Sequence, residues 1–292
     1  MKNVVARVLL VAVAVPALYA MAWFGDFLYR LPLALVVIAF AGAGGAELMR
    51  LLEPKAPSSR IAVAVALSAS PSIAAYLAQF VRGPGLESWA MAAPALVLAL
   101  FLIAGLPRAF ARASAEIRDA KRASSADSLL LIYPGLLAST LIPVIGAAGR
   151  GGMLAIWFSM IVFANDSLAW LVGVTMGRRR GIFGVSPNKS LEGLIAGLSG
   201  SVLGAALGPR LMPALVPVGL AAPSLPALVA FGIVIGAFVV AGDLYESSLK
   251  RSAEIKDSGE AIPGRGGFLD SFDSILYAAP IFLAAMAVFG IL

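Results

Sequence analysis

The sequence contains no cysteine and no histidine among its 292 residues. Their absence excludes disulfide bonds, thiolate nucleophiles, zinc sites of the Cys/His type, haem ligation by histidine and histidine general-base catalysis. Any metal ion must therefore be held by oxygen ligands, which favours Mg²⁺, Mn²⁺ or Ca²⁺. Acid–base chemistry is left to Asp, Glu, Lys, Tyr or water.

Charged residues are also scarce. They make up 13% of the chain, whereas 60% of the residues are hydrophobic and the mean hydropathy is +0.94. A soluble domain has about 25% charged and about 45–50% apolar residues. No hydrophilic stretch is long enough for a soluble domain of ordinary size. The composition therefore indicates one all-α, polytopic integral membrane domain.

Nine segments are long and apolar enough to cross a bilayer, which requires about 20 residues each. The first resembles a signal peptide, but no polar mature domain follows it, so we interpret it as a retained helix. A Pro- and Ala-rich segment at 209–226 leaves room for a re-entrant piece, so eight to ten spans fit the sequence. The nine predicted spans are 5–24, 31–49, 61–81, 89–107, 128–147, 152–175, 191–208, 227–246 and 274–291.

The basic residues follow the positive-inside rule if the N-terminus is cytoplasmic. Of the 22 lysines and arginines, 18 then fall in cytoplasmic segments, and only Arg30, Arg82, Arg150 and Arg210 fall outside. The net charge of +6 is thereby explained by loops that face anionic lipid, and no nucleic-acid partner is expected. Short loops without cysteine are typical of a bacterial inner membrane.

Ionisable residues within the predicted spans are few before residue 160. Glu47 lies near the end of the second span, where we expect it to reach the interface. Asp166 is different, because it follows Asn165 well inside the sixth span. A carboxylate there must pair, bind a cation or stay protonated. A structural ion pair is the alternative, although no basic residue lies deep in any span.

The loop after the sixth span holds three adjacent arginines and then the start of the next helix. Ser190 is a candidate N-cap for that helix. Gly, Ser and Lys at a helix start can also hold a phosphate group. An ordinary helix start and a phosphate site that uses the Lys189 ammonium are both open at this point.

The densest charged cluster follows the eighth span. Asp243 and Lys250 fall on one helical face together with Glu246, and Asp270 and Asp273 share the i, i+3 spacing before the last span. An ordinary charged loop is the alternative interpretation, but Asp243 lies in an apolar helix end. We predict that the acidic residues of both clusters converge at one depth to form a metal–phosphate site, namely Asp166, Asp243, Asp270 and Asp273.

At these residues the chain resembles the phosphatidate cytidylyltransferase (CDP-diacylglycerol synthase) family. The family pattern S-x-hydrophobic-K-R-x(4)-K-D, P-G-H-G-G, D-R-x-D is matched in spacing by Ser247–Arg251, Lys256–Asp257, Pro263–Gly267 and Asp270–Asp273. Its G-D-x-x-E-S, S-P-x-K-[ST]-x-E-G and N-D-x-x-A-[YW]-x-x-G elements are matched by Gly242–Ser247, Ser186–Gly193 and Asn165–Gly173. The matches cover about residues 160–292.

The resemblance implies a Mg²⁺-dependent enzyme that converts CTP and phosphatidate to CDP-diacylglycerol and pyrophosphate. It implies that the four aspartates hold Mg²⁺, alone or with a second cation such as K⁺, and that Asp243, Lys250, Asp270 and Asp273 are catalytic. Residues 1–150 would supply five generic transmembrane helices, and residues 151–292 would form the catalytic region. The active site would face the cytoplasm. A homodimer is compatible with the resemblance. Nucleotide and lipid phosphate would contact Ser186, Lys189, Glu192, Lys250, Arg251, Lys256 and Arg265.

Two departures from the family pattern keep alternatives open. Arg265 stands where the family has His, and Ser271 stands where it has Arg. Arg265 cannot act as a base, and Ser271 removes a cation. A CTP-dependent polyprenol or phytol kinase and a cytidylyltransferase for another lipid phosphate are therefore alternatives. A cation-coupled transporter whose Asp166 and Asp243 bind cations is a separate alternative. The charged loop argues against a transporter, whose sites lie near the midplane.

Overall fold

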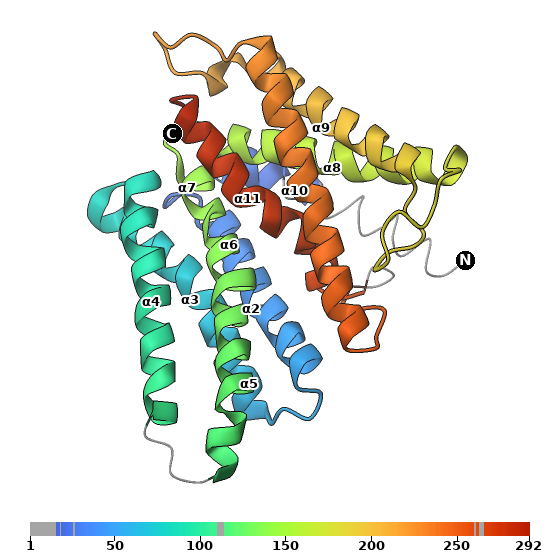
Figure 1. Ribbon diagram of the computed structural model, residues 1–292. Coiled ribbons are helices and arrows are strands. Elements are labelled where there is room, and N and C mark those ends of the chain that lie inside the picture. The colour runs from blue at the N-terminus through green and yellow to red at the C-terminus, as the bar shows by residue number, and fades with distance from the viewer. Residues whose placement is uncertain (1–15, 18, 26, 110–113, 260, 263–265) are drawn as a thin grey trace.

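The computed structural model describes residues 16–17, 19–25, 27–109, 114–259, 261–262 and 266–292 (Figure 1). These residues form helices and their connections, with two isolated bridges and no β-strand among them. The principal helices are α2 (Leu31–Leu52), α3 (Ser58–Arg82), α4 (Leu86–Ala109), α5 (Ser114–Leu130), α8 (Gly151–Thr175), α9 (Leu191–Leu211), α10 (Leu225–Ser252) and α11 (Leu269–Val288).

Eight helical segments of the described chain are long and apolar enough to cross a membrane. They correspond to the second to ninth predicted spans, which confirms an all-α polytopic membrane fold. The first predicted span, 5–24, falls mostly outside the described residues, although its last part, 19–24, is helical. The segment 209–226 contains the end of α9, a short 3₁₀ turn, η2 (Pro213–Leu215), and the first two residues of α10, so it adds no span.

The fifth predicted span is one helical rod with a break in its winding. After α5 it passes through a π-helical turn, η1 (Leu131–Leu136), and the short helices α6 (Leu137–Ser139) and α7 (Leu141–Gly146). Pro134 lies within the π-helical turn. Proline has no backbone N–H and its ring clashes with the preceding turn, so it disfavours regular α-helical bonding here.

The helices form two groups in Figure 1, with α2 to α5 on one side and α8 to α10 on the other. Helix α11 lies between them and contacts both α2 and α10. Aromatic rings hold α8, α10 and α11 together, because Trp157 lies edge-on to Phe231 and Phe282 at centroid distances of 5.9 and 5.6 Å. The Trp157 indole also donates a hydrogen bond of 3.1 Å to the carbonyl of Gly204 on α9.

Small residues allow α8 and α9 to approach closely. A Cβ atom at Gly197 would lie 3.0 Å from the Cβ of Ala169, and one at Gly204 would lie 2.9 Å from the Cα of Ile161. Side chains at these two positions would push the helices apart, as expected for packing in a membrane, where small residues line helix contacts. The close approach brings the start of α9 beside the half of α8 that carries Asn165 and Asp166.

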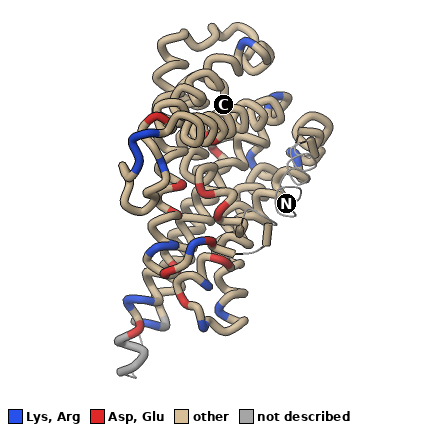
Figure 2. Tube along the Cα trace, turned by 90° about the vertical axis from the view of Figure 1, so that its right-hand side faces the viewer, with Lys and Arg blue, Asp and Glu red and all other residues tan. Residues whose placement is uncertain are grey.

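Charged side chains are unevenly distributed along the bundle. Most of the charged positions lie in the middle and lower part of Figure 2, with few at its upper end. One charged cluster is centred on a buried acid: Asp127, which is 3% exposed, pairs with Arg60 at 2.6 Å and with Arg108. The two positively charged arginines offset part of the free-energy cost of burying the Asp127 carboxylate.

Candidate active site

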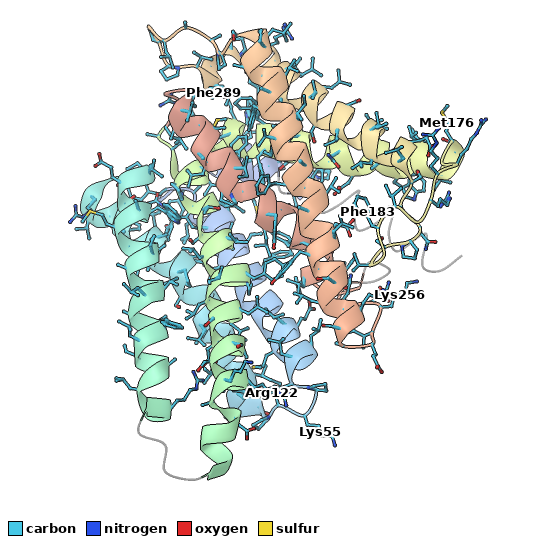
Figure 3. All side chains as sticks on the ribbon, in the orientation of Figure 1. Lys55, Arg122, Met176, Phe183, Lys256 and Phe289 are labelled. Atoms are coloured by element: carbon cyan, nitrogen blue, oxygen red, sulfur yellow. The ribbon has the colours of Figure 1, made fainter. Side chains whose placement is uncertain are left out.

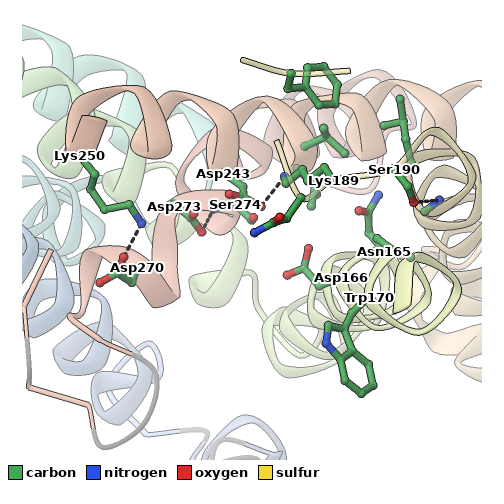
Figure 4. A pocket seen from close by; sticks show the side chains of 18 of the residues that line it. Asn165, Asp166, Trp170, Lys189, Ser190, Asp243, Lys250, Asp270, Asp273 and Ser274 are labelled. Atoms are coloured by element: carbon green, nitrogen blue, oxygen red, sulfur yellow. Dashed lines mark hydrogen bonds and ion pairs between the residues drawn. The ribbon is translucent and has the colours of Figure 1, made fainter. Parts of the chain in front are cut away.

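A cavity of about 600 Å³ lies between α8, α10, α11 and the loop before α9. All four predicted metal-binding aspartates line it: Asp166 from α8, Asp243 from α10, and Asp270 and Asp273 from α11. Figure 4 shows Asp166, Asp243 and Asp273 around the same space. The predicted convergence of acidic residues from three helices is therefore confirmed.

Two lysines face these carboxylates, and their surroundings differ. Lys189 forms an ion pair with Asp243, in which the two side chains are 28% and 39% exposed. Lys250 pairs with Glu246, four residues earlier on α10, and with Asp270 at 2.5 Å. The exposed fractions of these side chains are 11% for Lys250, 0% for Glu246 and 7% for Asp270. Only the first pair is thus open to exchange with solvent or a ligand.

Asp270 also holds the chain that connects α10 to α11. Its Oδ2 atom accepts hydrogen bonds from the backbone N–H of Ser258 at 2.8 Å, from the Ser258 hydroxyl at 2.9 Å and from the N–H of Gly267 at 2.8 Å. Ser271, at the position of the family arginine, donates to the carbonyl of Gly267 at 3.3 Å. The serine therefore supports the local turn and supplies no positive charge.

Asn165 and Asp273 are buried beside the cavity. The Asn165 amide donates to the Ser201 hydroxyl at 2.9 Å and to the Gly236 carbonyl at 3.4 Å, which links α8 to α9 and α10. Asp273 is 8% exposed, and its Oδ1 accepts a bond of 2.6 Å from the N–H of Ser274. The Asn165 contacts therefore hold in place the part of α8 that presents Asp166.

The loop between α8 and α9 is braced by its own polar groups. Glu192 accepts hydrogen bonds from the backbone N–H groups of Arg178 at 3.1 Å and Arg179 at 3.2 Å. The Arg180 guanidinium donates to the carbonyls of Gly173 at 2.8 Å and Asn188 at 2.9 Å. The loop thereby places Lys189 over the cavity (Figure 4).

The predicted N-cap at Ser190 is confirmed. The Ser190 side chain accepts a hydrogen bond of 3.1 Å from the N–H of Gly193, and α9 begins at the next residue. Such a cap satisfies one of the backbone donors that a helix start leaves unpaired.

Several predicted ligand-contacting residues do not line the cavity. The backbone of Ser186 and the side chain of Glu192 form hydrogen bonds within the loop, while Arg251 and Lys256 are exposed. Arg251 donates to the Ile255 carbonyl at 3.1 Å, and Figure 3 shows Lys256 on the connection after α10. Arg265 lies outside the described residues. The ligand contacts of these residues stay predictions.

The expectation for Glu47 was wrong. This side chain does not reach an interface: it is 5% exposed and accepts hydrogen bonds from the N–H groups of Phe268 and Leu269. Residues 1–150 thus include a group that contacts the chain beside the cavity. The adjacent run Ala-Gly-Ala-Gly-Gly-Ala was the missed signal, since small residues indicate a closely packed helix face.

The chain matches the model of the cytidylyltransferase family over residues 5–289. It is 33% identical over 157 residues to the phosphatidate cytidylyltransferase of Thermotoga maritima, which covers 54% of this chain and 57% of that protein. The corresponding Bacillus subtilis enzyme is 30% identical over 163 residues, 56% of this chain and 58% of the enzyme. Uncharacterized protein YnbB of Escherichia coli is 35% identical over 134 residues, 45% of this chain and 42% of YnbB. The matches thus span about half the length of these relatives.

Proposed function

The chain belongs to the cytidylyltransferase family, and on that premise we propose that it makes CDP-diacylglycerol and pyrophosphate from CTP and phosphatidate. The observation that carries the proposal is that one cavity is lined by five aspartates, four of them from three helices and Asp257 from the connection after α10, and by two lysines. This combination suits phosphoryl chemistry, which requires positioning and charge neutralisation more than covalent help from the protein.

In the proposed reaction an oxygen of the lipid phosphate attacks the α-phosphorus of CTP. A new P–O bond joins the lipid phosphate to the CMP group, while the bond from the α-phosphorus to the oxygen of the β-phosphate breaks. Pyrophosphate leaves with that bonding pair. The attacking phosphate is already ionised near neutral pH, so this step requires no general base. The absence of histidine from the chain is therefore compatible with the reaction.

Three carboxylates suit an oxygen-bound cation at the cavity. No group of three acidic residues in the described chain is tight enough to enclose a metal ion alone. Mg²⁺ is commonly held by one or two carboxylates, substrate phosphates and water, so an open arrangement fits it. We propose that Asp166, Asp243 and Asp273 hold Mg²⁺, which would neutralise phosphate charge when bound. A metal-binding role for Asp270, and a second cation such as K⁺, stay predictions.

The two lysines have different parts in the proposed reaction. Lys189 can leave Asp243 for a phosphate at small cost, because partly exposed ion pairs contribute only about 0–1 kcal/mol. Lys250 is confined between Glu246 and Asp270 and supplies a fixed positive charge beside the cavity. Triphosphate binding would therefore engage Lys189 first.

The lipid substrate would reach the cavity from the bilayer. Besides the charged residues, the lining includes the apolar side chains of Leu194, Val239 and Val240, and Trp170 stands at the cavity while 68% exposed. A phosphate headgroup could enter here while its acyl chains remain in the membrane. We place the cavity on the cytoplasmic side of a bacterial inner membrane, because the positive-inside rule orients the adjacent loops inward. A homodimer stays a prediction.

The test uses purified chain in detergent with phosphatidate, Mg²⁺ and CTP labelled at either the α- or the γ-phosphate. A cytidylyltransferase transfers the α-label to lipid and releases pyrophosphate, whereas a lipid kinase transfers the γ-label and releases CDP. Asp166→Asn should abolish the transfer, and Glu87→Gln, exposed at the start of α4, should retain it. Absence of α-labelled lipid, or transfer undiminished by Asp166→Asn, would overturn the proposal.

A further inference from the structure

Glu47 lies at the start of α11, although it belongs to α2. Its Oε1 accepts the N–H of Phe268 at 3.0 Å, and its Oε2 accepts the N–H of Leu269 at 2.8 Å. The hydroxyl of Ser258 lies 3.2 Å from the same Oε2. The donors stand more than 200 positions along the chain from Glu47, so the contact joins α2 to the start of α11, which lies between the two helix groups.

Helix α11 has no capping side chain of its own at Phe268. A helix start leaves its first backbone N–H groups unpaired and carries a partial positive charge. Here three consecutive N–H groups reach carboxylates, with Gly267 bonded to Asp270 and the next two residues bonded to Glu47. Glu47 therefore acts as an N-cap supplied from another helix.

The surroundings of Glu47 are shaped to its carboxylate. A Cβ atom at Gly259 would lie 2.7 Å from Oε1, so a side chain at that position would displace the carboxylate or the backbone. Seven residues before Glu47, on the same face of α2, the ring of Phe40 stacks on Phe272 at a centroid distance of 3.9 Å and lies edge-on to Phe268 at 4.9 Å. Polar and aromatic contacts together fix the first turn of α11 against α2.

That first turn carries Asp270, and Asp273 follows three residues later, so both are presented to the cavity from the segment that Glu47 holds. We propose that Glu47 is a positioning residue that sets the start of α11 and thereby the placement of these two aspartates. Its effect on turnover rests on the proposed function, whereas its effect on the order of the α11 start does not.

The experiment compares Glu47→Gln with the wild-type chain by hydrogen–deuterium exchange and by CTP kinetics. The amide group of Gln presents N–H₂ where a carboxylate oxygen accepted a bond, so at least one backbone donor loses its partner. Hydrogen–deuterium exchange at the amides of Phe268 and Leu269 should accelerate about 10-fold or more, because the free energy of a hydrogen bond to a charged acceptor corresponds to a factor of about that size. The kcat per folded molecule should fall about 10- to 100-fold, because small displacements of reacting groups are costly.

Glu53→Gln is the matched control, since Glu53 follows α2 and does not line the cavity. It should leave both readouts within about twofold, as expected of substitutions away from special contacts. If Glu47→Gln yields no folded protein, Glu47→Asp is measured instead. That variant keeps the charge but shortens the reach, so both effects should keep their sign and be smaller.

The two readouts separate the inference from the proposed function. Faster exchange at the α11 start in a chain without cytidylyltransferase activity would support the placement by Glu47 and overturn the function. Unchanged exchange in a folded variant would overturn the inference whatever the activity. Faster exchange with unchanged kcat in an active enzyme would reduce Glu47 to a structural cap and would also overturn it.

Discussion

Replacing Lys250 by Met tests the buried ion pairs beside the cavity. Met keeps the length of the side chain and removes its charge. Asp270 retains its bonds from Ser258 and Gly267, so it keeps partners in the variant. Glu246 does not, because its side-chain oxygens have no hydrogen-bond partner among the described residues and depend on the ion pair with Lys250. The loss of stability should therefore come from Glu246, which is left without a partner.

Removing one partner of a buried ion pair costs about 3–5 kcal/mol, because the remaining charge is poorly solvated. At about 2–4 °C per kcal/mol, a loss of about 3 kcal/mol lowers the melting temperature by about 6–12 °C. If Glu246 is neutralised by a proton in the variant, the loss shrinks to about 1–3 kcal/mol. Replacing both residues, as Lys250→Met with Glu246→Leu, should return the melting temperature to within about 3 °C of wild type, since apolar replacement of a buried pair is often neutral.

Intrinsic tryptophan fluorescence measures this unfolding, since the chain has four tryptophans and no cysteine for a thiol-reactive dye. Arg251→Met is the matched control: Arg251 is the next residue and is exposed, so its loss should shift melting by less than about 2 °C. The reasoning fails if Lys250→Met melts like the control. It also fails if the double variant melts below the single one, since the loss would then not come from an uncompensated Glu246.

Three further predictions follow from burial and capping. Asp127→Asn should leave Arg60 and Arg108 without their counter-charge and destabilise the chain by about 3 kcal/mol, seen as a lower melting temperature, while turnover per folded molecule stays within about twofold. Ser190→Ala should lower the free energy of unfolding by about 1 kcal/mol in a denaturation series, and Ser190→Gly should lower it by only about a few tenths of a kcal/mol, as for other N-caps. Asp243→Asn should lower kcat about 100-fold or more while melting shifts by less than about 4 °C, and a stability loss as large as that of Asp127→Asn would contradict it.

Hydropathy could predict the membrane helices because the thickness of a bilayer fixes how many apolar residues must follow one another. It could not place the break at η1, since Pro134 lies in an apolar run whose mean hydropathy is unaffected by a change in winding. Spacing could predict acids that line the cavity: Asp270 and Asp273 are three residues apart on one helix and both line it. Charges deep in apolar helices are rare, so those present pointed to a site.

Motif spacing does not state where each side chain points, and this explains why some of the predicted residues do not line the cavity. Arg251 follows Lys250 directly on α10, and successive helical residues are about 100° apart around the axis. Lys250 faces α11, so Arg251 must face elsewhere, and it is exposed. For Glu47, the preceding run of small residues indicates a packed helix face but does not identify its partner, because the donors are mostly backbone N–H groups more than 200 residues away and every residue type except proline carries such a group.

The burial of each ion pair separates the residues that hold the cavity from those that can respond to a ligand. Lys250, Glu246 and Asp270 are nearly enclosed, so opening their pairs would leave charges without solvent, and they are suited to remain as a fixed framework. Lys189 and Asp243 are partly exposed, so in the proposed reaction a cation would replace the lysine at Asp243 while a phosphate takes the lysine. One exchange of partners would thus admit both halves of a metal–nucleotide complex. Such an exchange requires a rigid α11 behind it, because Asp273 must keep its position while Asp243 changes partner.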